Sequence, residues 1–130
     1  MLIPKDLDKY FQETVWRLPR PWVAYAPLEV APEPAWRPAE DGRIRLGSFN
    51  NLNKLSDSCL SLWAQVLRAL PEATLLLKDK LALDGALQRR VIDTLSRHGV
   101  QQDRVTFLPR VPDWQSHMAL YDQLDIALDT

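Results

Sequence analysis

Residues 43–71 read RIRLGSFNNLNKLSDSCLSLWAQVLRALP, and this stretch decides the fold. Apolar and polar residues alternate in its first part, which predicts a strand over residues 43–50. The second part predicts a helix over residues 57–70, with Ser56 or Asp57 as its N-cap. Large apolar residues recur there at helical spacing: Leu60, Trp63, Leu67 and Leu70. A strand, a polar loop and a helix in this order are typical of a parallel α/β fold.

The same alternation continues along the rest of the chain. It predicts strands over residues 73–77, 105–108 and 126–128, and helices over residues 84–98 and 113–123. Crossovers between parallel strands are right-handed almost without exception. These elements therefore predict an α/β fold with four parallel strands in the order 3-2-1-4 and helices against the sheet, which is half of a doubly wound architecture.

Ligands of such sheets bind beyond the carboxyl ends of the strands. Four segments follow the predicted strands and are the places where chemistry is expected: residues 50–56, 78–80, 109–117 and 129–130. No Gly-x-Gly-x-x-Gly motif and no P-loop follows a strand, so a dinucleotide site of the dehydrogenase type is not expected. No cysteine and histidine spacing fits a zinc site, and no metal ligand is assigned.

The loop after the first predicted strand is rich in polar side chains. Asn50, Asn51, Asn53 and Lys54 precede the N-terminus of the first predicted helix. Free backbone amides and the partial positive charge of a helix N-terminus favour an anion, and Lys54 would add a full charge. A solvated turn in which asparagines bond to their own backbone explains the same residues equally well.

A second candidate loop follows the third strand and reads LPRVPDWQSH over residues 108–117. His117 lies in the first turns of the next predicted helix, where its ring could donate to a phosphate or ribose oxygen. A histidine packed beside Met118 and Tyr121 is the competing interpretation. Arg110 is either an anion ligand or an ordinary surface arginine, and Asp129 is either a ligand contact or a turn residue.

The first 42 residues differ from the rest of the chain. Seven of the ten prolines precede Gly42. Proline removes a backbone donor, so a long helix or a central strand is excluded there, although a short helix at residues 5–12 is compatible. We expect an extended arm over residues 1–42. Its aromatic content is too high for a free linker and predicts that the arm lies on another surface: Tyr10, Phe11, Trp16, Trp22, Tyr25 and Trp36.

Composition excludes several classes of protein. The formal net charge is −1 and charges of both signs are mixed, so neither nucleic acid nor an anionic membrane is an expected partner. Cys59 is the single cysteine, which excludes an internal disulfide and favours a reducing compartment. The first residues lack the layout of a secretory signal, and no apolar run has membrane-spanning length. These features predict a soluble, cytoplasmic protein.

Several of these segments together resemble a known family. They are Gly47-Ser-Phe-Asn-Asn-Leu-Asn-Lys54, Leu62-Trp63, Arg104-Val-Thr-Phe-Leu-Pro109 and Asp125-Ile-Ala-Leu-Asp-Thr130. In this order and spacing they look like the catalytic region of the O-linked N-acetylglucosamine transferase family, which includes SPINDLY-type enzymes. The resemblance implies that residues 43–130 are the first, Rossmann-like half of a GT-B nucleotide-sugar-binding domain. Residues 1–42 would be the arm or interdomain segment before it.

The resemblance also implies roles for individual residues. Lys54 matches the family lysine that binds the donor diphosphate, and Asn51 matches the polar residue beside it. His117 matches a histidine that contacts the nucleotide. Arg110 and Val111 fall in the nucleotide-contacting loop, where this sequence is one residue longer than family members. No catalytic residue is assigned to this chain, and no metal or other cofactor is expected beside the UDP-sugar donor.

The function implied is transfer of a sugar, N-acetylglucosamine from its UDP donor, to Ser or Thr hydroxyls of an acceptor protein. The chain would supply part of the UDP-binding site, would be inactive alone, and would associate with itself or with a partner that completes the site. A non-catalytic α/β interaction module is the alternative. A receiver-type phosphorylation domain is disfavoured, because asparagines stand where it needs clustered acids.

Overall fold

The computed structural model describes residues 4–17, 19 and 32–130, and the chain divides into two compact units, residues 1–30 and 31–130. In the first unit, the helix expected over residues 5–12 is a short 3-10 helix, η1 (Lys5–Tyr10). Arg17 forms an ion pair with Asp8 there. The expected aromatic residues Trp22 and Tyr25 lie outside the described residues.

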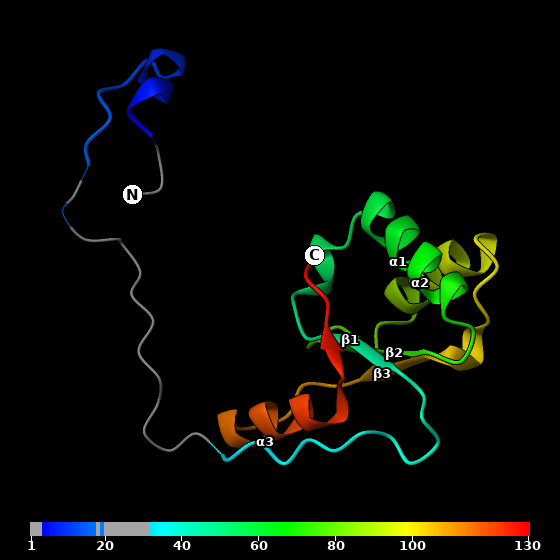
Figure 1. The fold of residues 1–130 in the computed structure, drawn as a ribbon. Coiled ribbons are helices and arrows are strands. Elements are labelled where there is room, and N and C mark those ends of the chain that lie inside the picture. Colours follow the sequence, from blue (N-terminus) through cyan, green and yellow to red (C-terminus); the bar gives the residue numbers. More distant parts are fainter. Residues whose placement is uncertain (1–3, 18, 20–31) are drawn as a thin grey trace. The chain divides into compact units, whose positions relative to one another are not determined.

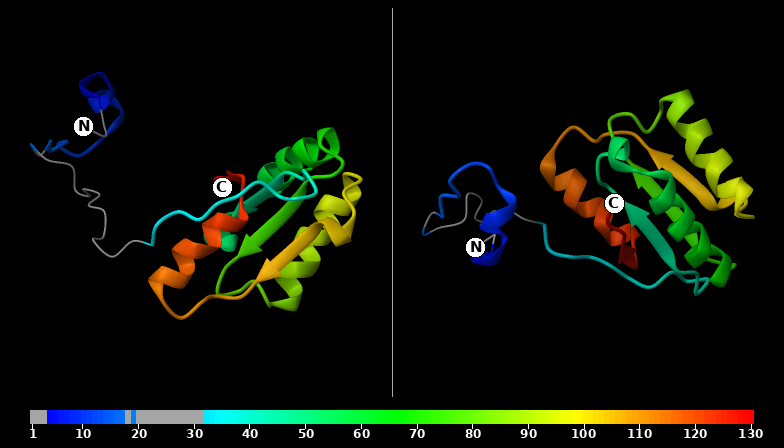
Figure 2. Two further views of the ribbon diagram at one scale, coloured as in Figure 1. Left: turned by 60° about the horizontal axis from the view of Figure 1, so that its bottom comes forward. Right: turned by 90° about the horizontal axis from the view of Figure 1, so that it is seen from above.

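The second unit contains a four-stranded parallel sheet with strand order β3-β2-β1-β4, as predicted. The strands are β1 (Arg45–Ser48), β2 (Thr74–Lys78), β3 (Val105–Leu108) and β4 (Ile126–Ala127). The helices are α1 (Asp57–Ala69), α2 (Gly85–Arg97) and α3 (Trp114–Ala119), with 3-10 turns η2 (Leu52–Lys54), η3 (Gln102–Arg104) and η4 (Leu120–Gln123). Helices α1 and α2 cover one face of the sheet, and α3 lies on the other (Figures 1 and 2).

Local signals set the ends of the helices. Ser56, one of the two N-caps expected for α1, accepts a hydrogen bond from the backbone amide of Cys59, so its cap role is confirmed. Gly99 follows α2 with φ of 82°, a left-handed conformation that glycine adopts without steric cost. The third predicted helix, residues 113–123, is wrong in its second half, where the chain tightens into the 3-10 turn η4.

The core lies mainly between the sheet and the helices α1 and α2. It consists of fully buried aliphatic residues from the strands, the helices and the loop after β1: Leu46, Leu52, Leu55, Leu60, Leu67, Leu75, Leu77, Val91 and Leu95. On the other face of the sheet, the backbone of Gly47 lies against Leu124. A Cβ at Gly47 would stand 2.4 Å from that side chain and 2.8 Å from the carbonyl oxygen of Leu76, so only glycine fits there.

Residues 32–42, the second part of the predicted arm, belong to the same compact unit as the sheet. They run as an extended segment along α3 (Figure 1). The amide of Ala35 donates to Asp122 Oδ1 at 3.0 Å, and Trp36 Nε1 donates to Asp125 Oδ1 at 2.9 Å. This part of the arm therefore lies on the sheet domain. Along the described parts of the chain, no helix is both long and apolar enough to span a bilayer.

Candidate functional site

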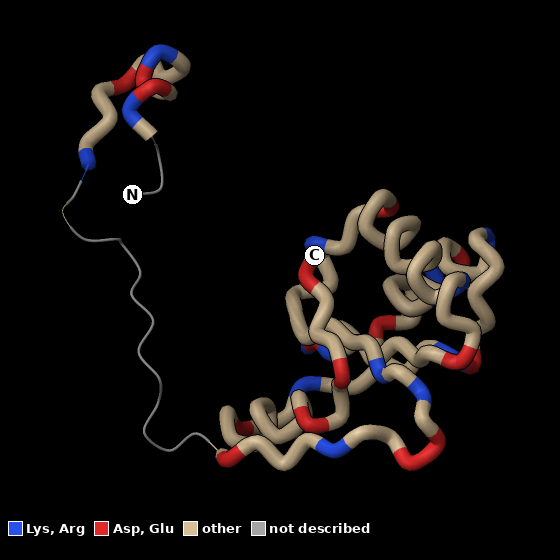
Figure 3. Tube along the Cα trace, viewed as in Figure 1, with Lys and Arg blue, Asp and Glu red and all other residues tan. Residues whose placement is uncertain are grey.

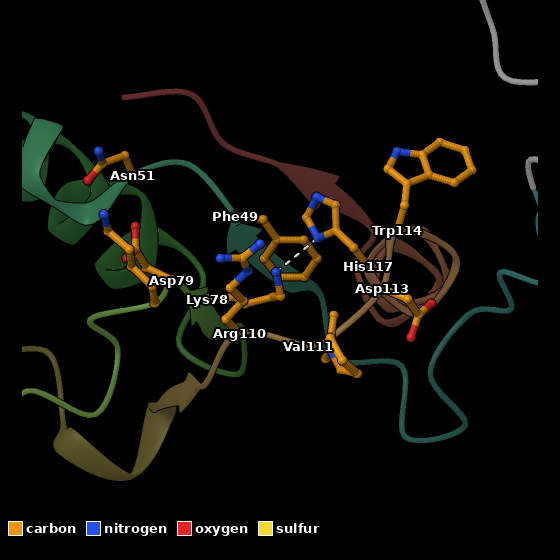
Figure 4. A pocket seen from close by; sticks show the side chains of 11 residues that line it. Phe49, Asn51, Lys78, Asp79, Arg110, Val111, Asp113, Trp114 and His117 are labelled. Carbon is orange, nitrogen blue, oxygen red and sulfur yellow. Dashed lines mark hydrogen bonds between the residues drawn. The ribbon is translucent and has the colours of Figure 1, made fainter.

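An open pocket of about 460 Å³ lies at the carboxyl edge of the sheet (Figure 4). Side chains from the ends of β1, β2 and β3 and from the first turns of α3 line it. They are Phe49, Asn51, Lys78, Asp79, Lys80, Arg110, Val111, Pro112, Asp113, Trp114 and His117. In a parallel α/β sheet this is the edge where ligands bind, because the loops that leave the strands diverge there.

Asp79, directly after β2, holds two of the loops in place. Its Oδ2 accepts the amide of Leu52 at 2.9 Å, and its Oδ1 accepts the amide of Leu81 at 2.8 Å. The first bond ties the turn η2 to the end of β2. Asp113 is the N-cap of α3, where it accepts hydrogen bonds from the amide and the hydroxyl of Ser116. These bonds lower the pKa of Asp113.

Lys78 and His117 meet in the pocket. Lys78 is the last residue of β2 and is only 6% exposed, and its Nζ lies 2.9 Å from Nδ1 of His117. The dashed line in Figure 4 marks this contact. Burial lowers the pKa of Lys78, and the charge of Arg110 lowers it further. Burial also lowers the pKa of His117, with Lys78 as the second cause.

Two further rings, those of Phe49 and Tyr121, support this pair. Phe49 packs against His117 and Tyr121 with centroid distances of 5.9 and 4.7 Å, and the rings of His117 and Tyr121 are 5.6 Å apart. The Nζ of Lys78 lies 5.6 Å from the centre of the Phe49 ring, within the range of a cation–π interaction. Phe49 gives the pocket an apolar wall, and both rings contact the imidazole.

The pocket carries more positive charge than its own carboxylates neutralise. Among the described residues, no carboxylate lies within ion-pair distance of Lys78, Lys80 or Arg110. The two acids that line the pocket, Asp79 and Asp113, accept hydrogen bonds from backbone or hydroxyl groups. The arrangement is therefore suited to an anionic ligand that brings its own negative charge.

The structure brings four of the five predicted site residues into this pocket: Asn51, Arg110, Val111 and His117. The fifth, Lys54, is exposed on η2 and is not among the residues that line the pocket. The assignment of these five residues to nucleotide contacts stays a prediction. Outside the pocket, Asn50 donates to Asp129 Oδ1 at 2.7 Å, so this pair links the ends of β1 and β4.

The sequence did not assign Phe49, Lys78, Lys80 or Trp114 to the site, although all four line the pocket. The signal available for the two lysines was their position, since residues 78–80 follow a predicted strand. Nothing in the sequence distinguished Lys78 from Lys80, because the difference between them, a buried and an exposed side chain, arises only in the folded domain. Among the described residues, no group of three or more His, Cys, Asp or Glu side chains is arranged to hold a metal ion.

Fold and pocket together define the class: a doubly wound α/β domain with a candidate anion site beyond the carboxyl ends of its strands. Comparison with solved structures makes this more specific. The chain matches an O-GlcNAc transferase mutant from Thermobaculum terrenum with a TM-score of 0.80 and 33% sequence identity. The match covers 98% of this chain and 24% of that one. The sheet and its helices therefore correspond to part of a GT-B domain.

Among curated proteins, the chain is homologous to the SPINDLY O-GlcNAc transferases. It is 34% identical over 131 positions to a protein from Solanum lycopersicum and 35% identical to one from Oryza sativa. Both carry the name probable UDP-N-acetylglucosamine–peptide N-acetylglucosaminyltransferase SPINDLY. The alignments cover 98% of this chain, which spans 14% of the length of those relatives. No protein-family model matches the chain.

Proposed function

We propose that this chain forms part of the donor-binding domain of a glycosyltransferase that moves N-acetylglucosamine from its UDP donor to Ser or Thr hydroxyls of a protein. The observation that carries the proposal is the pocket at the ligand-binding edge of the sheet, where a histidine meets cations that have no carboxylate partner in the described part of the chain. Homology to the SPINDLY proteins, and the match to a bacterial O-GlcNAc transferase, support the same assignment.

The pocket offers suitable groups for both halves of a nucleotide. Arg110, Lys78 and Lys80 give the pocket positive charge that can neutralise phosphate oxygens. Phe49, Val111 and Trp114 offer apolar surface for a base. Asn51 lies toward the opposite end of the pocket from Trp114 (Figure 4). Lys54, three residues beyond the η2 N-cap Asn51 along the chain, is proposed as a further diphosphate ligand on the family resemblance alone.

The chemical step needs an acceptor hydroxyl and a group that activates it, held together with the donor. Orientation of this kind contributes about 7–11 kcal/mol of barrier lowering. We assign none of the described residues to that step. We therefore expect the 130-residue chain to bind the donor and not to turn it over by itself. No metal or other cofactor is part of the proposal, and we propose a cytoplasmic location on the single cysteine.

The proposal is tested by titrating the chain with UDP and following backbone amide shifts. Binding should perturb residues 50–56 and 110–117. Arg110→Ala should weaken binding about tenfold, as expected for a lost charge-assisted contact of about 1.4 kcal/mol. Lys54→Ala should weaken binding as well. The matched control is Arg68→Ala, because Arg68 is an exposed arginine in the last turn of α1.

Absence of UDP binding, or binding that neither Arg110→Ala nor Lys54→Ala weakens, would contradict the proposal. That outcome would favour the alternative, a non-catalytic interaction module. One observation supports this alternative, namely that Trp16 and Tyr10 are 84% and 73% exposed. Large exposed aromatic side chains are typical of binding surfaces. Self-association of the chain stays a proposal, and light scattering over a concentration series tests it.

A further inference from the structure

Lys78 is an unusual lysine for its place in the fold. It is the last residue of β2, which pairs with β1 on one side and β3 on the other, and its side chain is buried. Buried ammonium groups normally have a carboxylate partner, because a desolvated charge without one is costly. Here the partner at hydrogen-bond distance is the imidazole of His117, with Nζ and Nδ1 2.9 Å apart.

A contact of this kind holds one shared proton. Lysine is by far the stronger base, with ordinary pKa values of about 10.4 for lysine and 6.5 for histidine. The proton therefore stays on Nζ, and an ammonium group donates hydrogen bonds but cannot accept one. Nδ1 of His117 is the acceptor, and the hydrogen of the neutral ring must be on Nε2. A second proton on the ring would place two cations in direct contact.

The surroundings leave His117 no other strong partner for Nδ1 among the described residues. Phe49 and Tyr121 contact the ring through their aromatic faces and edges. The charged groups around the pocket are Lys78 at the end of β2, Asp79 and Lys80 directly after it, and Arg110 and Asp113 after β3. Both carboxylates accept hydrogen bonds from backbone or hydroxyl groups. The imidazole is thus oriented by one cation and two rings.

We propose that Lys78 is a positioning residue of the donor site: its ammonium group holds His117 as the neutral Nε2–H tautomer, which then donates a hydrogen bond to an oxygen of the bound nucleotide. The inference rests on the proposed function only for the identity of the ligand. The tautomer itself is a property of the free chain. Lys78 acts through His117 and need not transfer a proton.

Nitrogen shifts of the His117 ring in the free chain test the tautomer directly. In the wild-type chain, we expect the Nε2–H form alone, with no titration of His117 between about pH 6 and 8. Lys78→Met should populate both tautomers and raise the pKa of His117, because the donor and the neighbouring charge are both lost. Lys78→Arg, which keeps a charged donor, should restore the wild-type behaviour. The matched control is Lys80→Met, since Lys80 lines the same pocket but is exposed.

Ligand affinity supplies the second measurement. UDP-N-acetylglucosamine is a suitable probe, because both of its phosphates are esterified and neither titrates near neutral pH. The ratio of its Kd values at pH 6 and pH 8 should stay near one for the wild-type chain and for Lys80→Met. Lys78→Met should bind more tightly at pH 6 than at pH 8, by about threefold or more, because the ring now gains a proton beside the diphosphate.

The two kinds of failure are separable. A wild-type His117 that carries its hydrogen on Nδ1, or that titrates identically in the wild type and in Lys78→Met, would overturn the positioning role whether or not UDP binds. A wild-type chain that does not bind UDP-N-acetylglucosamine would overturn the proposed ligand. Amide spectra of each variant establish that the domain is folded, and the wild-type ring shifts decide between the two tautomers even if Lys78→Met does not fold.

Discussion

The two ends of the parallel sheet differ in whether their charged side chains are paired. At the amino end, Asp125 before β4 accepts from the backbone amide and guanidinium of Arg45, at 2.6 to 3.1 Å, and from Trp36 Nε1 at 2.9 Å. At the carboxyl end, Lys78 and Arg110 have no carboxylate within ion-pair distance among the described residues. We call these groups the amino-end clamp (Trp36, Arg45, Asp125) and the carboxyl-end cluster (Lys78, Arg110, His117).

The difference shows what each group contributes. The clamp satisfies its carboxylate completely, and the hydrogen bonds from Arg45 hold the pKa of Asp125 well below its usual range. In the cluster, the described residues include no carboxylate that pairs with the positive charge. Burying Lys78 therefore costs stability in the free chain, and a bound anion would offset this cost. Figure 3 shows acidic and basic residues mixed along the trace, so this contrast arises from local contacts and not from a charged half of the domain.

The largest effect is expected from Asp125→Ala at the clamp. The substitution removes an acceptor that serves three donor groups, and we expect the free energy of unfolding to fall by about 2–3 kcal/mol, as for other part-buried hydrogen bonds to a charged group. Urea denaturation measures this. Asp103→Ala, an exposed acid in η3, is the control and should change stability by less than about 0.5 kcal/mol. A comparably small effect of Asp125→Ala would break the comparison.

The contribution of the clamp to stability should also depend on pH. Because the folded-state pKa of Asp125 is depressed, its contribution is complete above the unfolded-state value of about 3.9 and is lost as the pH falls further. Between pH 6 and pH 3, the wild-type chain should therefore lose more stability than Asp125→Asn does. Equal losses in the two proteins would show that the carboxylate is not stabilised by folding.

A smaller effect of opposite sign is expected from Lys78→Met in the cluster. An apolar side chain of similar length removes a buried cation that has no carboxylate partner among the described residues, so the free chain should gain about 1 kcal/mol of stability. Thermal unfolding in the absence of nucleotide is the measurement. A loss of stability would mean that the contact with His117 outweighs the cost of burying the charge, and it would weaken the contrast between the two ends.

The smallest effect is expected from Ser48→Ala, at the last residue of β1. The Ser48 hydroxyl is buried and has no hydrogen-bond partner among the described residues. Removing it deletes an unsatisfied polar group and leaves almost no cavity, so stability should stay unchanged or rise by up to about 1 kcal/mol. Cys59→Ser on α1 introduces a hydroxyl instead of removing one, and it serves as the comparison. A clear loss in Ser48→Ala would indicate a bond to water that holds this end of the strand.

The arrangement of the secondary structure was readable from local patterns. Residues 105–108 were predicted as a strand and form β3 without change. The first strand was predicted over residues 43–50, and the observed β1 (Arg45–Ser48) is two residues shorter at each end. The third helix was overextended, because the periodicity of residues 113–123 is shared by an α-helix and a 3-10 turn. Apolar spacing shows which face is buried but does not show where the backbone tightens.

The sequence by itself determined the strand order and the edge at which a site must lie. Alternating strands and helices with short connections leave few topologies, and right-handed crossovers select one of them. The polar loops after the strands then fall at one edge, which is why Asn51, Arg110 and His117 could be proposed as candidates from the sequence, whereas Val111 was added by the family resemblance. These conclusions depend on spacing along the chain, and spacing is visible in the sequence.

Only the tertiary structure decided which charges meet. Lys78 and His117 are 39 positions apart and Arg45 and Asp125 are 80 apart, so no local pattern links either pair. Lys78 is one of two lysines in Lys78-Asp-Lys80, and its burial comes from its place at the end of a strand that has a neighbour on both sides. Desolvation depends on the packing of elements distant in sequence. The same amino acid is therefore a buried partner of a histidine at position 78 and a solvated surface charge at position 80.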